Sequence, residues 1–117
     1  MAKKAKETKI KEKIDELVSI FSNLSEDTQR TIKPLIDKAA FMSVTLDDLQ
    51  DDININGVIE QYQNGANQFG VKKSAAVDVY NTMIKNYTSI MKQLTDLLPK
   101  EEQTSRAGDS LKAFINE

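Results

Sequence analysis

Residues 52–63, DININGVIEQYQ, come closest to a metal-binding pattern in this sequence. A calcium-binding EF-hand loop has carboxylate or amide ligands at its first, third and fifth positions, glycine at its sixth and a bidentate glutamate at its twelfth. The residues that agree with such a loop are Asp52, Asn54, Asn56, Gly57 and Ile59. The twelfth residue, however, is Gln63, and Asn64-Gly65 indicates a turn where the second helix of an EF-hand would begin. We therefore expect no metal site here, and we interpret Gly57 as the residue that ends a helix.

Four aspartates in the same region are the second set of residues that could do chemistry. They are Asp47, Asp48, Asp51 and Asp52. Two-metal nucleases hold their ions with carboxylates, but they gather these groups from separate elements around a pocket. The four aspartates lie in one short segment with no Lys or His beside them. We interpret the cluster as the solvated face of a helix.

The amino-acid composition removes most other catalytic chemistry. The chain has no Cys and no His, which excludes disulfides, thiol nucleophiles, zinc sites and imidazole acid–base catalysis. Its four glycines are too scattered to form a phosphate-binding loop. We expect one domain of 117 residues that is not an enzyme and has no cofactor. No uninterrupted apolar run is long enough to cross a membrane, so we expect a cytoplasmic protein.

Positive charge is concentrated at the N-terminus. Residues 1–13 contain six lysines and two glutamates, whereas residues 45–60 contain five acidic and no basic residues. A basic arm on an acidic body is a common arrangement for contact with nucleic acid, and the alternative is a solvated, frayed N-terminus. We expect residues 1–8 to form a flexible basic arm. The lysines expected to contact DNA phosphates without reading bases are Lys3, Lys4, Lys6, Lys9, Lys11 and Lys13, with Lys72 and Lys73 as secondary candidates beside a helix N-terminus.

Apolar periodicity predicts three helices before Gly57. Apolar residues at steps of three and four indicate a helix over residues 9–23. Ser25 is the expected N-cap of a second helix, and Pro34 either kinks that helix or marks its true start. Thr45 is the expected N-cap of a short third helix.

The sequence then changes from helical to strand periodicity. Asn64-Gly65 is a strong signal for a two-residue hairpin turn, because both positions of that turn need positive φ. We therefore expect a β-hairpin over residues 58–71 in which Gln63 pairs with Ala66. The apolar residues that this register places on one face, where they would pack on the helices, are Val58, Tyr62, Phe69 and Val71.

The last predicted helix is the clearest element of the chain. It begins after Ser74, an N-cap, and ends at Leu98, just before Pro99. Two adjacent apolar stripes run along it, whereas one partner helix needs only one stripe. The surplus stripe predicts contact with another subunit, and burial within one domain is the alternative. The residues expected at or near a subunit interface are Met83, Tyr87, Ile90 and Met91.

Together these elements predict a mainly α fold with minor β, made of short N-terminal helices, one small β-hairpin and one long helix. We expect a single helical domain over residues 9–100. Residues 101–117 are expected to be a C-terminal tail with a short helix, which is either loose or docked through its apolar residues.

Four features of residues 39–100 occur in a characteristic order. They are a short helix ending at Gly57, a polar turn centred on Asn64-Gly65, the step Lys72-Lys73-Ser74, and a long helix that closes in Leu-Leu-Pro. In this order the segment resembles the small terminase subunits of tailed bacteriophages and prophages, in the family common in phages of Gram-positive bacteria. The chain departs from the pattern at Ala75, where many members of that family have proline.

The resemblance implies a non-enzymatic DNA-recognition subunit of a phage packaging motor, at work in the cytoplasm of a bacterial host. Such subunits assemble into homo-oligomeric rings, bind double-stranded DNA near its packaging start, and regulate the large terminase subunit that carries the ATPase and nuclease. The alternative hypothesis is a helical protein–protein interaction module or small regulator whose lysines only confer solubility. A calcium sensor is a third hypothesis.

Overall fold

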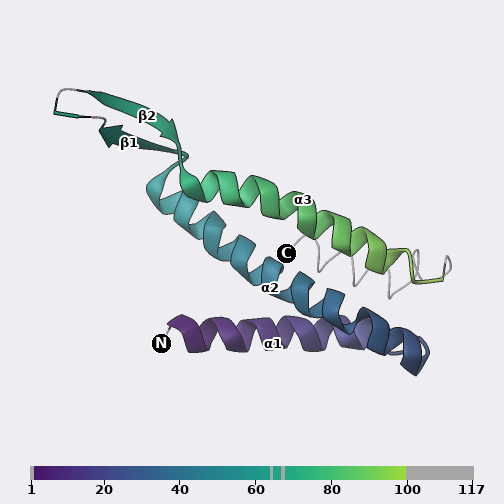
Figure 1. The fold of residues 1–117 in the computed structure, drawn as a ribbon. Coiled ribbons are helices and arrows are strands. Elements are labelled where there is room, and N and C mark those ends of the chain that lie inside the picture. Colours follow the sequence, from purple (N-terminus) through teal and green to yellow (C-terminus); the bar gives the residue numbers. More distant parts are fainter. Residues whose placement is uncertain (1, 64, 67, 100–117) are drawn as a thin grey trace.

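Three helices and one β-hairpin make up the fold, in a computed structural model that describes residues 2–63, 65–66 and 68–99. The elements in chain order are α1 (Ala2–Ile20), α2 (Glu26–Asn56), β1 (Ile59–Gln63), β2 (Phe69–Lys73) and α3 (Ala75–Thr95). Both α1 and α3 pack along α2, and the hairpin projects from the end where α2 stops and α3 starts (Figure 1). The fold is mainly α with a two-stranded antiparallel sheet, which confirms the fold class expected from the sequence.

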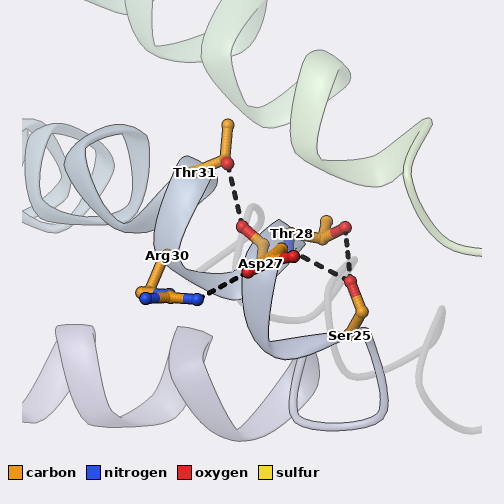
Figure 2. Close-up of polar contacts among 5 residues, drawn as sticks. All are labelled: Ser25, Asp27, Thr28, Arg30 and Thr31. Atoms are coloured by element: carbon orange, nitrogen blue, oxygen red, sulfur yellow. Dashed lines mark hydrogen bonds and ion pairs between the residues drawn. The ribbon is translucent and has the colours of Figure 1, made fainter.

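Ser25 is the N-cap of α2, as its position in the sequence predicts. Its hydroxyl oxygen accepts a hydrogen bond from the Thr28 backbone N–H at 3.2 Å, and its hydroxyl donates to Thr28 Oγ1 at 2.9 Å (Figure 2). Asp27 lies in the first turn, where the partial positive charge of the helix N-terminus favours a carboxylate. Its side chain accepts from Arg30 Nη2 at 2.5 Å, and its carbonyl accepts from Thr31 Oγ1 at 2.8 Å (Figure 2). Local polar contacts therefore define the start of α2.

One continuous helix, α2, replaces the two helices that the sequence analysis separated at Thr45. Thr45 lies inside α2 between Val44 and Leu46, which are only 3% and 6% exposed. Burial of these neighbours keeps the segment helical and outweighs the preference of threonine for a helix N-cap. The hydroxyl of Thr45 is buried without a hydrogen-bond partner among the described residues, and this unsatisfied group is unfavourable.

Pro34 lies within α2 and does not begin it, because the helix starts at Glu26. Proline has no backbone N–H, so the carbonyl of Arg30, four residues earlier, loses its usual helical donor. Pro34 is exposed, so this loss falls on a side of the helix that solvent can reach.

Residues 2–8 are the first part of α1, which begins at Ala2, so they do not form the separate arm expected from the sequence. The ammonium group of Lys6 holds this part of α1 against α2. It lies 5.1 Å from the centre of the Phe41 ring and 3.7 Å from Asp48 Oδ2. A cation over an aromatic face and an ion pair thus give the basic segment a packing partner that apolar periodicity does not reveal.

The core forms where α1 and α3 cover α2. Its buried residues are Leu17, Phe21, Ile32, Ile36, Ala39, Leu46, Tyr87, Met91, Leu94 and Leu98. Tyr87 and Met91 are 4% and 1% exposed within the single chain, which favours burial within one domain, the alternative to the expected subunit interface. Met83 and Ile90 are half-buried and pack against the same core. Residues of both stripes of α3 pack against this core, which α2 lines as one helix of 31 residues instead of two short ones, while Leu97 stays 42% exposed.

The ends of α3 agree only in part with the prediction. Ser74 caps its start, with its Oγ accepting from the Ala76 N–H at 3.2 Å. The helix ends at Thr95 instead of Leu98, and the Leu98 N–H then donates to the Thr95 carbonyl at 3.0 Å in a tighter turn. Leu98 is nevertheless buried in the core. The expected C-terminal tail, residues 101–117, lies outside the described residues.

The β-hairpin is present, but its register differs from the expected one. Gln63 pairs with Phe69 instead of Ala66, so the connecting loop is longer than a two-residue turn. The hairpin also stands clear of the helices (Figure 1), whereas the sequence analysis expected it to pack on them.

Two cross-strand pairs account for the observed register. Glu60 lies opposite Lys72, with Oε1 3.4 Å from Nζ. Tyr62 lies opposite Gly70, and a Cβ added to Gly70 would come within 2.6 Å of the Tyr62 ring. The tyrosine ring therefore occupies space that only glycine leaves open. The expected register would have set Glu60 opposite Phe69 and forfeited both pairs.

Gly57 ends α2, as expected, and turns the chain into β1. Its φ of 83° and ψ of 179° lie in a region that is essentially open to glycine only. Its N–H donates to the Ile53 carbonyl at 2.8 Å. The ψ value differs from that of the left-handed residue common at helix ends.

We expect Gly57→Ala to lower the free energy of unfolding by about 1–3 kcal/mol through backbone strain. No atom lies within 4 Å of a Cβ added there, so a steric clash does not contribute. Urea unfolding followed by circular dichroism measures the change. Asn56→Ala is the matched control, because Asn56 is the preceding helical residue and no described non-glycine residue has positive φ. An equal loss in both variants would contradict the backbone explanation.

We expect Met91→Ala to lower the free energy of unfolding by about 2–5 kcal/mol, because it empties a fully buried position. Val79→Ala, on the same helix at 48% exposure, is the control and should have a small effect. Urea unfolding and sedimentation are measured on both. If Met91→Ala instead reduced the assembled mass and left the free energy of unfolding unchanged, Met91 would lie at a subunit interface, as expected from the sequence.

Candidate functional site

The calcium-like segment is divided between a helix and a strand. Residues 52–56 lie at the end of α2, and residues 59–63 form β1. Asp52 accepts a hydrogen bond from the Asn56 side chain. In the described part of the chain, no group of three or more acidic, His or Cys residues could hold a metal ion. The geometry here is that of a helix end followed by a hairpin.

The candidate DNA-binding lysines of α1 do not share one side of the helix. Lys6, Lys9 and Lys13 recur at spacings of three and four, so they lie on one side, whereas Lys11 projects from another. Lys6 is held by α2, and Lys13 lies 3.7 Å from Glu16. Lys9 and Lys11 are exposed, and neither pairs with a carboxylate among the described residues. The described side chains do not include Lys3 and Lys4.

The secondary candidates Lys72 and Lys73 lie in β2, and each pairs with a carboxylate. Lys72 pairs with Glu60 across the hairpin, and Lys73 Nζ lies 2.9 Å from Asp78 Oδ1. Asp78 is in the first turn of α3. One of the protein's own carboxylates thus already complements the positive end of this helix, where an anion would otherwise bind.

The hairpin carries an exposed apolar face, whereas the sequence analysis placed Phe69 and Val71 on a face packed on the helices. Its register places Ile59, Phe69 and Val71 on the same side of the two strands, because opposed and alternate residues of a ladder share a side. These side chains, which we call the hairpin face, are 59%, 73% and 61% exposed. Just before β1, Ile55 and Val58 are also exposed, at 80% and 57%. The largest exposed apolar side chains of this region therefore gather at one end of the molecule.

The hydrogen-bond pattern determines which residues line the open edges of the hairpin. The Ser74 N–H donates to the opposed Val58 carbonyl at 2.9 Å, so this pair is of the hydrogen-bonded type. Hydrogen-bonded and non-hydrogen-bonded pairs alternate along an antiparallel ladder. The residues whose N–H and C=O groups point outward are therefore Ile59, Gln61 and Gln63 on β1 and Phe69, Val71 and Lys73 on β2. Within the described chain, neither edge is paired with a further strand.

A second apolar surface lies between α2 and α3. Met42, Val79 and Met83 line an open hollow of about 400 Å³ together with polar side chains of α3. A small-molecule site needs a few polar groups that converge in an enclosed pocket. This hollow is open, so it provides contact area and not a specific ligand site.

Comparisons with protein-family models, with curated proteins and with solved structures found no match for this chain. Across the residues that the structure describes, no helix has the length and apolar character needed to span a membrane. The function of this chain is therefore inferred from the surfaces described above.

Sequence reasoning missed the hairpin face because an alternating apolar pattern predicts a face and not what covers it. The signal that could have found it is the pairing of Tyr62 with Gly70. An aromatic ring and a glycine are complementary across two strands, and aligning them gives the observed register directly.

We expect simultaneous replacement of Ile59, Phe69 and Val71 by threonine to leave the core intact. Threonine favours strands, and surface substitutions of this kind change stability by about 0.5 kcal/mol or less. Retention on a hydrophobic column should fall, while the urea midpoint should stay close to that of the unchanged protein. A large loss of stability, comparable to that of Met91→Ala, would show that the hairpin face belongs to the core.

Proposed function

We propose that this protein is a non-catalytic binding subunit of a phage DNA-packaging terminase, equivalent to the small subunit that residues 39–100 resemble. The observation that carries the proposal is the hairpin face. It is an exposed apolar surface on an element that the core does not bury, and it lies inside the segment that carries the resemblance.

The hairpin face suits a protein partner. Clustered apolar side chains on a surface mark an interaction site more often than scattered ones do. Phe69, the most exposed of the three, offers an aromatic side chain of the type that anchors protein–protein contacts. In a terminase within a bacterial host, the partner would be the large subunit, with further copies of this chain completing the ring.

For DNA, we assign the phosphate contacts to the two exposed lysines of α1, Lys9 and Lys11, which project from different sides of the helix and so act as two separate contact points. Lys9 and Lys11 can bind phosphate without breaking an ion pair, because neither is paired with a carboxylate among the described residues. Lys6, Lys72 and Lys73 would first have to give up ion pairs of 2.9–3.7 Å. Contacts made only by lysines to phosphates position a protein on DNA without reading its sequence.

We expect Lys9→Gln combined with Lys11→Gln to weaken binding to duplex DNA and to reduce its salt dependence. Each lost phosphate contact lowers the slope of log K against log salt by about one. The matched control combines Lys38→Gln with Lys85→Gln, which makes the same change in charge at two other exposed lysines. Mobility shifts at several salt concentrations give both slopes. Equal slopes in the two variants would remove α1 from the DNA contact.

A helical protein-interaction module without DNA binding is the second candidate. The ion pairs of Lys6, Lys72 and Lys73 favour it, because they neutralise lysines that DNA would otherwise use. The same mobility shifts separate the two functions. If the unchanged protein shifts no duplex DNA even at low salt, the DNA-binding function fails and the interaction module remains.

A further inference from the structure

The two edges of the hairpin differ in how well they are protected. Natural sheets block unwanted strand pairing with edge lysines, prolines and bulges. The β2 edge carries Lys73, and its side chain is engaged with Asp78. The β1 edge presents Ile59, Gln61 and Gln63, which include no charge and no proline, and the five pairs run without a bulge. The β1 edge is therefore an open template for another strand.

A two-stranded hairpin is marginally stable in water unless it gains further strands or packs on another element. Here the helices do not supply that packing, because the hairpin stands beyond them (Figure 1). Among the described residues no third strand lies beside β1, so a strand from another chain is free to pair with this edge.

We propose that β1 pairs antiparallel with β1 of a second copy, about a two-fold axis at Gln61, to give a four-stranded sheet. This inference deepens the proposed function, since it names one contact between copies, but it stands on the hairpin geometry alone. A two-fold contact closes on itself, so any larger ring would use other surfaces as well.

The side chains select this register over its neighbours. With Gln61 opposite Gln61 of the second copy, Ile59 lies opposite Gln63 and Tyr62 lies opposite Glu60. All five residues of β1 then have a partner, and no like charges are opposed. Sliding by two residues in one direction would set the two Glu60 side chains opposite each other, which is destabilising. Sliding in the other direction would leave Ile59 without a partner.

The contact is small. Two five-residue edges bury less than the roughly 1,200 Å² of a stable protein–protein interface. We therefore expect a weak dimer whose population rises with protein concentration. The paired sheet also joins two copies of the hairpin face on one side, which doubles the apolar surface available to a further partner.

A cysteine scan tests the pairing, because the natural chain contains no cysteine. In the paired sheet the two Gln61 Cα atoms would lie about 5.5 Å apart, within disulfide range. Gln61→Cys should therefore become a disulfide-linked dimer under mild oxidation. The control is Val71→Cys, opposite Gln61 on the same side of the hairpin. Its Cα atoms would be about three strand spacings, or about 14 Å, apart, so it should stay monomeric.

Gln61→Pro is the complementary variant. The Gln61 N–H points outward, so proline there leaves the intrachain ladder intact and removes a donor that the second copy needs. Sedimentation should show that this variant has lost the concentration-dependent dimer, while Gln61→Thr retains it and helix content is equal in both. If Gln61→Pro perturbs the fold, the cysteine pair alone decides.

Three results would overturn the pairing. The first is an unchanged protein that stays monomeric at the highest concentrations reached. The second is Gln61→Cys that cross-links no faster than Val71→Cys, and the third is preferential cross-linking of Val71→Cys, which would indicate stacking of hairpin faces. These outcomes are separate from the salt dependence conferred by Lys9 and Lys11, so failure of the dimer and failure of DNA binding are distinguishable.

Discussion

Burial of α2 on two sides at once is the constraint on which the rest of the structure depends. At 31 residues, α2 is about 46 Å long, longer than either helix that covers it. Leu17 and Phe21 reach the core from α1, and Met91 and Leu94 reach it from α3, all at 1% exposure or less. Most helical stability in proteins comes from tertiary packing of an apolar face, and each large side chain buried in the core contributes roughly 1.5–3 kcal/mol. The three helices are therefore stable because they share one core, and a break in α2 at Thr45 would divide that core.

This arrangement requires a connection between α2 and α3, but it does not require that the connection form a hairpin. Antiparallel helices in a bundle need a connection of only about 2–8 residues. The connection from α2 to α3 instead runs from Gly57 to Ser74 and is closed at its base by the bond from the Ser74 N–H to the Val58 carbonyl. Most of its residues lie beyond the core, where they contribute nothing to covering α2. This extra length is available for the binding role proposed above.

Features set by neighbouring residues could be predicted from the sequence, and features set by distant contacts could not. The caps at Ser25 and Ser74 and the helix end at Gly57 depend on local backbone chemistry, and all three are confirmed. The continuity of α2 through Thr45 depends on burial of its neighbours, which no local signal reports. The burial of Tyr87 within its own chain also depends on distant contacts, and it favours burial within one domain, the alternative to the expected interface. For the candidate site, the sequence predicted that a hairpin is present. It did not predict which side chains lie on the hairpin face, because these depend on the strand register, and local turn chemistry does not determine that register.

The core and the hairpin are consequently stabilised by different contacts and lie in different parts of the molecule. The helices pack many of their apolar side chains into one shared core. The hairpin exposes Ile59, Phe69 and Val71 and has only two strands, so its order depends more strongly on what binds it. Any partner that binds the folded hairpin shifts its equilibrium toward order by mass action. Ordering of the hairpin and assembly with such a partner would then be one coupled equilibrium, next to a helical scaffold that has its own core.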